Sequence, residues 1–347
     1  MKKTLAALIV TAFAASAANA AVVYDNEGTK VELNGSLRLI MEKADKKVYN
    51  AANQSTKKAN SALRNAGSRL GITVKHNLDN DFYALGRVEF RFDDTTSRDK
   101  FGGVYAKRAY VGLGSKAIGE LKFGRQLTIA DDLSQANDYE YGFIPKGDYI
   151  PTSGTGVVRY DYKGIEGLQL SANYNFGQTN NEKGKPLNPG IKNAYAVGAL
   201  YTAGDLDARF AYGHTNLETN ATYKHRLDGF LASLGYKFGD FKLTGDFGYA
   251  HEKENDAKTN KFYVSPGFAY QVVPASKVYG NYLYERVKGE NTKDKTHGFL
   301  LGADYQLHKQ VVVFLEGKYV TKKEYVADTL DKKTKDRAIG VGMRVFF

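Results

Sequence analysis

The charged residues with the most regular spacing are basic ones on segments that alternate between apolar and polar residues. This alternation places Arg38, Arg69, Arg87 and Arg108 on the polar face of their segments. A polar face that lines water with guanidinium groups creates a positive potential, which acts on passing ions and solutes rather than on chemical bonds. Any one of these residues could equally be a solvated charge or half of a salt bridge, so the interpretation depends on the set.

Motifs for bond-making chemistry are missing from the sequence. There is no G-x-S-x-G elbow and no Cys, and the six His residues are scattered without metal-ligand spacing. The stretch 112–117, GLGSKA, resembles a dinucleotide-binding loop, but a new strand follows it at once, which predicts a turn. We therefore expect no enzyme activity, no cofactor and no metal site.

The elements that would position the arginines are strands of period two. In the first, Leu37, Leu39 and Met41 share one face while Ser36 and Arg38 share the other. About sixteen such segments follow one another, mostly of about eight to twelve residues, which is longer than typical soluble strands and suits tilted strands that cross a bilayer. A soluble sheet with one packed face remains the alternative for any single strand.

The connections sort into two kinds that alternate strictly. Short turns are predicted near 78–80, 115–119, 164–167, 203–205, 239–240, 274–276 and 308–309. Long polar loops are predicted at 43–66, 93–103, 126–155, 177–192, 214–225, 251–261, 287–297 and 321–336. Short turns at one end and long loops at the other are typical of an outer-membrane barrel of sixteen antiparallel strands, with periplasmic turns and outer loops.

Composition agrees with a barrel in a membrane. The chain has 25 Tyr and 19 Phe but no Trp and no Cys, and many aromatic residues stand at strand ends, where interfacial girdles would form. The precursor carries a formal charge of +11. Such a charge is compatible with nucleic acid, but we expect no nucleic-acid partner, because the chain is predicted to be exported and contains no basic helix.

Both ends of the chain contain recognisable sequence features. Residues 1–20 combine Lys2 and Lys3, a short apolar stretch and an Ala-Asn-Ala site, which predicts a cleaved signal peptide and a single barrel domain over 21–347. Removing the two lysines leaves +11 − 2 = +9. The chain stops within the alternating segment that ends at Phe347, so we expect this strand to close the barrel against the first one.

Several motifs in this order resemble the Gram-negative general porins, most closely the major porin of the Haemophilus and Pasteurella type. They are AVVYDNEGTKVELNGSLRL at the predicted mature start, SRLGI at 68–72, KRAYVGL at 107–113, GELKFGRQ at 119–126 and the terminal GVGMRVFF. The resemblance implies a homotrimer in the outer membrane, in contact with lipid and lipopolysaccharide and assembled by the barrel-assembly machinery through its C-terminal strand.

The resemblance also implies a constriction, formed by a third loop that folds inward. Here the third loop is 126–155. Its acids Asp131, Asp132, Asp138 and Glu140 would face a basic wall, to which the family pattern assigns Arg69, Arg108 and Arg125, and strand parity adds Arg38 and Arg87. Two positions depart from the family: Ser36 replaces a common Lys, and the Arg that normally follows the loop has no clear counterpart, since Arg159 comes several residues late.

The function predicted from these features is passive, size-limited diffusion of small hydrophilic solutes and ions, with weak selectivity. A substrate-selective sugar porin is one alternative, in which Tyr139, Tyr141, Phe143 and Tyr149 would form an aromatic track. A structural or adhesive barrel with a blocked lumen is another, in which outer lysine pairs contact acidic glycans or phosphates.

Overall fold

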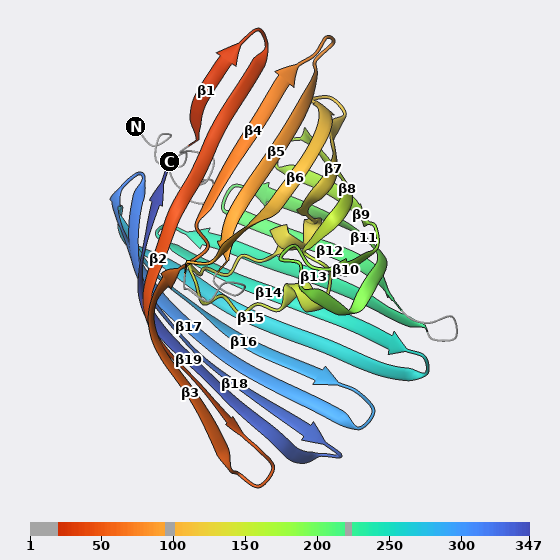
Figure 1. The fold of residues 1–347 in the computed structure, drawn as a ribbon, viewed down its shortest axis with the longest axis vertical. Coiled ribbons are helices and arrows are strands. Elements are labelled where there is room, and N and C mark those ends of the chain that lie inside the picture. The colour runs from red at the N-terminus through yellow and green to blue at the C-terminus, as the bar shows by residue number, and fades with distance from the viewer. Residues whose placement is uncertain (1–19, 94–100, 219–223) are drawn as a thin grey trace.

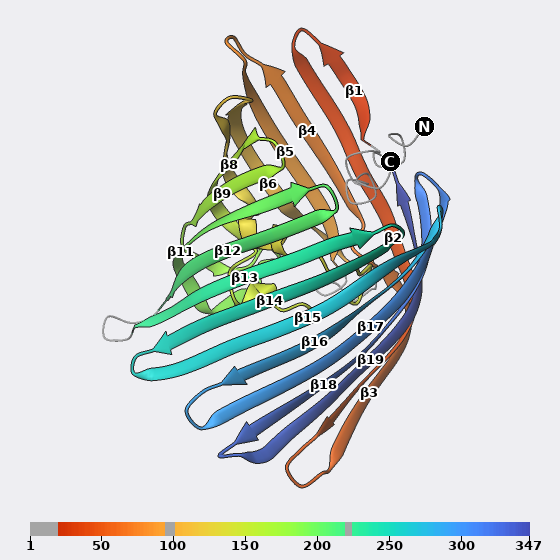
Figure 2. The same cartoon turned by 180° about the vertical axis from the view of Figure 1, so that it is seen from behind.

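The computed structural model describes residues 20–93, 101–218 and 224–347, and these form one antiparallel sheet closed into a barrel (Figures 1 and 2). The predicted signal peptide falls almost entirely outside the described residues. The strands are β1 Ala21–Asn26, β2 Thr29–Tyr49, β3 Ser55–Asn65, β4 Arg69–Asn77, β5 Phe82–Asp93, β6 Gly103–Ser115, β7 Gly119–Leu127, β8 Ser153–Ile165, β9 Leu168–Asn175 and β10 Gln178–Asn180. They continue with β11 Pro186–Ala203, β12 Leu206–Leu217, β13 His225–Phe238, β14 Phe241–Glu254, β15 Ala257–Val273, β16 Ser276–Lys288, β17 Thr292–His308, β18 Val311–Val326 and β19 Thr329–Phe346.

These segments occupy the 16 strand positions of a closed barrel, as the sequence predicted. β3 and β4 lie in line along the same edge of β2, and β9 and β10 lie in line along β11. On the other edge of β2, β1 pairs with residues 29–33 and β19 with residues 36–49, so these two also share one position. The pairing of β19 with β2 closes the ring and leaves no long unpaired edge.

The two faces of the sheet have the reverse of a soluble protein's polarity. Large apolar side chains such as Met41, Val111 and Leu301 are 60% or more exposed on the outward face. Polar residues such as Glu89, Asp246 and Glu316 are at most 2% exposed on the inward face. An apolar belt of this kind is stable only in contact with lipid. No helix of the described residues is long and apolar enough to cross a membrane.

All seven short turns lie where the sequence predicted them, between strands at one end of the barrel. The two-residue hairpin loops among them include 204–205 and 239–240, in which Gly204 and Gly239 have φ angles of +57° and +58°. This left-handed backbone matches the twist of the flanking strands, and glycine adopts it without steric cost.

At the opposite end the strands run further than predicted. The ranges 43–66, 177–192, 251–261, 287–297 and 321–336, expected as loops, consist largely of paired strand, and the turn between β18 and β19 is only Ala327–Asp328. The alternation signal fails here because these hairpins carry polar residues on both faces. The loops predicted at 93–103 and 214–225 lie partly outside the described residues.

The longest connection among the described residues is irregular. Residues 128–152, between β7 and β8, contain no strand and only two short 3₁₀ turns, Ile129–Leu133 and Lys146–Asp148. In Figure 1 this yellow-green segment runs within the ring of strands.

Candidate functional site

A buried carboxylate on β18 holds the middle of the 128–152 segment. Glu316 accepts hydrogen bonds from the backbone N–H groups of Tyr139 (2.6 Å), Glu140 (2.8 Å) and Tyr141 (2.6 Å), and from the hydroxyl of Tyr279 (2.8 Å). Its side chain is 0% exposed, and four donors around one carboxylate offset the cost of burying its charge. Parity places Glu316 on the inward face, but nothing in the sequence indicates that it receives this segment.

A second wall carboxylate, Asp246 on β14, holds the segment a few residues earlier. It accepts the N–H groups of Gln135 (2.9 Å) and Ala136 (3.2 Å) and the hydroxyl of Ser134 (3.0 Å). Both carboxylates bind backbone groups, so they fix the path of the segment rather than one particular side chain.

The two ends of the segment are anchored by apolar contacts. Ile129, Leu133, Tyr149 and Ile150 are at most 2% exposed and pack against inward-facing residues of β11 to β16, among them Ala196, Ala211, Leu231, Ala250, Tyr263 and Leu283. A glycine on β13 makes the close approach possible, because a Cβ at Gly229 would lie 2.1 Å from the carbonyl oxygen of Tyr149. The segment is therefore attached along its whole length to the inward face of the wall.

The four predicted acids of the segment have different surroundings. Asp132 pairs with Arg159 (2.6 Å) and Glu140 with Arg64 (2.6 Å), while Asp131 lies 3.6 Å from the ammonium of Lys146. Asp138 is exposed and forms no ion pair in the described parts of the chain. Arg64 and Arg159 are thus contacts of these acids that the sequence analysis did not include in the basic wall.

Four of the five predicted arginines lie on the inward face of neighbouring strands. Three basic groups contact Glu89, namely Arg87 (3.0 Å), Arg91 (2.7 Å) and Arg108 (3.7 Å). Arg108 alternates with the outward-facing Val111 and so faces inward, and a bulge in the pairing of β5 with β6 shifts the register of the residues just before it.

Two pairs of arginines on adjacent strands face each other in the same inward cluster. Arg69 is directly opposite Arg91, and Arg38 is directly opposite Arg344. Like charges in directly opposed positions destabilise a sheet, so the cluster has a cost in stability. We call Arg38, Arg69, Arg87, Arg91, Arg108 and Arg344 the arginine cluster.

Arg344 links the arginine cluster to the segment. Its guanidinium donates a hydrogen bond to the carbonyl oxygen of Tyr139 and lies 4.7 Å from the centre of that ring, which stacks on Phe314 at 4.6 Å. Arg344 was not among the arginines predicted for the basic wall, although the alternation of Val341, Met343 and Val345 places it on the polar face.

The fifth predicted arginine, Arg125, is not part of the cluster. It is directly opposite Ala109, which is exposed on the outward face, and its guanidinium donates to the carbonyl oxygens of Ala106 (2.7 Å) and Glu182 (3.4 Å). Lys122 and Gly124 occupy the inward positions of β7, so the alternation itself turns Arg125 outward.

Phe347 lies where the two ends of the barrel chain meet along β2. Its N–H donates to the carbonyl oxygen of Gly35 (3.1 Å), whose N–H donates back to Phe347 (2.8 Å). Ala21, the first residue of β1, lies two residues further along β2, opposite Leu33.

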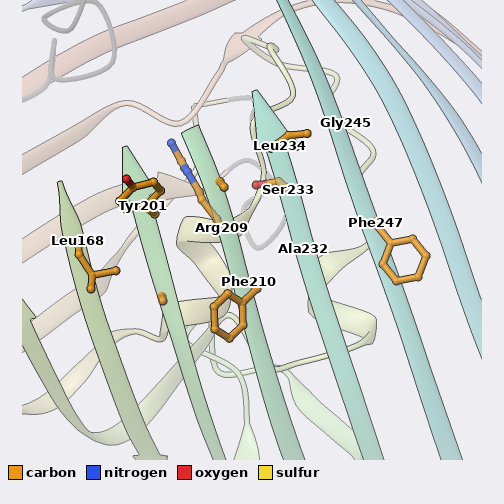
Figure 3. Close-up of a pocket in the computed structure, with 11 residues that line it drawn as sticks. Leu168, Tyr201, Arg209, Phe210, Ala232, Ser233, Leu234, Gly245 and Phe247 are labelled. Carbon is orange, nitrogen blue, oxygen red and sulfur yellow. The ribbon is translucent and has the colours of Figure 1, made fainter. Parts of the chain in front are cut away.

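The aromatic residues of the segment do not form an exposed track. Tyr149 and Tyr141 are 1% and 6% exposed, and the hydroxyl of Tyr139 donates to Asp304 (2.7 Å). A crevice of about 500 Å³ lies instead on the outward face of β9 to β14, where Tyr201, Phe210 and Leu234 surround small residues such as Ala232 (Figure 3). The described residues contain no group of three or more His, Cys, Asp or Glu side chains that could hold a metal ion.

Comparisons with known proteins agree with the barrel fold described above. The family model described as Gram-negative porin matches residues 4–325. The chain is also 32% identical, over 100% of both sequences, to the major outer membrane protein of Pasteurella multocida strain Pm70. It belongs to the Gram-negative porin family.

Solved structures share the fold at lower identity. In-vitro folded OmpT of Vibrio cholerae, in a trimer form, has a TM-score of 0.68 at 20% identity and covers 92% of this chain and 100% of its own. The anion-selective porin of Comamonas acidovorans has a TM-score of 0.65 at 17% identity, with the same coverage. This porin is therefore a channel-forming barrel of the outer membrane rather than a member of an enzyme family.

Proposed function

We propose that this porin is a general diffusion channel whose passage is narrowed by the 128–152 segment. The observation that carries the proposal is the attachment of this segment to the inward face through Glu316 and Asp246. A segment bound there occupies part of the cross-section that water and solutes would use, so passage is limited by size.

The charges around the passage give it weak anion selectivity. Two of the four segment acids, Asp132 and Glu140, are close to neutralised by Arg159 and Arg64. The arginine cluster has six positive groups, and only three of them contact a carboxylate within it, that of Glu89. Rings of fixed charge favour mobile ions of opposite sign, and the exposed Asp138 opposes this preference only in part.

No sugar-selective track and no catalytic function are part of this proposal. The aromatic side chains of the segment are occupied by the wall, as Tyr139 is by Phe314, so they are not available to guide a sugar. We also infer that the protein is exported with residues 1–20 as a cleaved signal peptide, that 21–347 is one barrel domain, and that it has no enzyme activity.

The same proposal includes its assembly. We infer a homotrimer, supported by the trimer form of the Vibrio cholerae structure. We further infer that the barrel-assembly machinery recognises the C-terminal strand that ends at Phe347, and that lipid and lipopolysaccharide surround the outward face.

Swelling of proteoliposomes in isotonic solutions of sugars and amino acids of increasing size tests the proposed diffusion. We expect swelling rates that fall smoothly with solute size and do not depend on sugar class. Fast entry of one sugar class alone would indicate a substrate-selective porin, and no swelling with folded protein would indicate a blocked barrel.

A further inference from the structure

The strand register gathers lysines at the end of the barrel opposite the short turns. Lys47 on β2 is directly opposite both Lys57 on β3 and Lys335 on β19. In the neighbouring row, Lys333 on β19 is directly opposite Lys323 on β18. Lys323 is in turn opposite Lys295 on β17. We call these six residues the lysine patch.

All six belong to the outward face. Lys47 has the same parity along β2 as the exposed Met41, and Lys335 the same parity along β19 as the exposed Ile339. The other members share the faces of Leu63, Leu315 and Phe299, which are also exposed. The lysine patch therefore begins where the apolar belt ends, on the side of the long connections.

Three inward-facing lysines at the same end are neutralised, whereas the patch is not. Lys318 pairs with Asp336 (2.8 Å), Lys322 with Asp294 (2.8 Å) and Lys332 with Glu324 (2.9 Å). No carboxylate of the described residues forms an ion pair with a lysine of the patch, although Lys323 and Lys333 are chain neighbours of Lys322 and Lys332. Asp294, Glu324 and Asp336 point inward, and the outward-facing Asp45 pairs with Arg337, so neither group of acids balances the charge of the patch.

The patch lysines also crowd around one aromatic ring. The ammonium groups of Lys47, Lys335 and Lys333 lie 4.9, 5.7 and 6.0 Å from the centre of Tyr49. Contacts with one ring offset only part of the repulsion between like charges that face one another across strands. A bound external anion would offset the remaining repulsion between the lysines.

We propose that the lysine patch binds the phosphate groups of lipid in the outer leaflet of the outer membrane. A phosphate there would lie above the apolar belt that contacts the acyl chains, at the level of the lipid headgroups. This inference assigns residues to the lipid contact proposed above and depends on the membrane location, not on the pore. Each lysine near such an anionic surface strengthens binding by about fivefold.

Neighbouring lysines that lie on opposite faces of the same strands provide a matched control. The test pair is K323Q/K333Q, on the outward face, and the control pair is K322Q/K332Q, whose residues are the next ones along the chain and face inward. Binding of diphosphorylated lipid A to each full-length barrel is measured by native mass spectrometry in detergent. We expect K323Q/K333Q to bind about 25-fold more weakly and K322Q/K332Q to bind as the parent protein does.

Three outcomes would overturn the proposal. Equal losses in both double variants would mean that face does not matter. Equal binding of dephosphorylated lipid A would remove phosphate from the recognition, and lysine-dependent binding of inositol hexakisphosphate at the same strength would point to a soluble polyanion. If the double variant does not fold, K333Q against K332Q makes the same comparison. Single-channel conductance provides a separate readout, which we expect to be unchanged in all of these variants.

Discussion

Arg344 and Arg125 carry the same charge but lie on opposite faces of the barrel wall. Substituting each of them separately therefore distinguishes a role in the passage from an effect of the total charge of the barrel. Arg344 contacts the 128–152 segment from the inward face, while Arg125 lies on the outward side of β7. Removing one charge about 4 Å from the path of an ion costs about 1 kcal/mol in water, a factor of about five in the permeability ratio.

We therefore expect R344Q, R69Q and R108Q each to shift the reversal potential in a salt gradient toward cation preference, by up to that factor. R125Q should leave the reversal potential unchanged. An equal shift in R125Q and R69Q would show that the total charge of the barrel, and not the arginine cluster, sets selectivity.

Glu316 tests whether a single buried side chain holds the segment in place. In E316A three backbone N–H groups of the segment lose their acceptor, and each unsatisfied buried group costs about 1–3 kcal/mol. We expect the segment to detach in part, which raises single-channel conductance and current noise.

The matched control for this variant is E324A on the same strand, because Glu324 pairs only with Lys322 and Lys332 among the described residues. Its conductance should equal that of the parent protein. Parent-like conductance in folded E316A would mean that the apolar ends of the segment suffice to hold it.

As an element, the 128–152 segment is the part of the fold that most directly affects the proposed passage. Deleting residues 131–147 removes the contacts with Glu316 and Asp246 and leaves the strands β7 and β8 intact. The passage should widen, so single-channel conductance should rise. Shortening the hairpin turn at 289–291 serves as the control, and a deletion that leaves conductance unaltered would place the segment outside the conducting path.

Strands and short turns could be predicted from the sequence because each leaves a local pattern. Period-two alternation located the lipid-facing belt, and pairs such as Gly239 and Asp240 located the turns. The hairpin extensions could not be predicted in the same way. In β2 and β3, for example, Lys46 and Lys47 pair with Lys58 and Lys57, and strands in water on both faces show no apolar alternation.

The candidate site was predictable in part for a related reason. Parity assigns a residue to a face, which was enough for Arg38, Arg69, Arg87 and Arg108 and would have been enough for Arg344. The contacts of Glu316 and Asp246 join residues more than a hundred positions apart in the chain. No local pattern encodes such a contact, and the outward position of Arg125 shows that a motif match can identify a residue without giving its direction.

At the scale of the whole molecule, the barrel depends on the contact between its two ends. β1 and β19 share one strand position along β2, and Phe347 pairs with Gly35 at their junction. Deleting Phe347 removes these hydrogen bonds and leaves part of β2 unpaired, which is costly in lipid.

We expect this deletion to reduce the folded fraction, seen as loss of the heat-modifiable band on gels. F347Y, which keeps the ring and both backbone hydrogen bonds, should fold like the parent protein. Normal heat-modifiable mobility after the deletion would show that β19 closes the barrel without its last residue.

The central claim is a water-filled channel with weak anion selectivity, and single-channel current across a planar bilayer with a salt gradient tests it most directly. The structure predicts stepwise, ohmic conductance and a small reversal potential whose sign indicates anion preference. A cation-selective sign would contradict the role given to the arginine cluster, and silence from correctly folded barrels would contradict the channel itself.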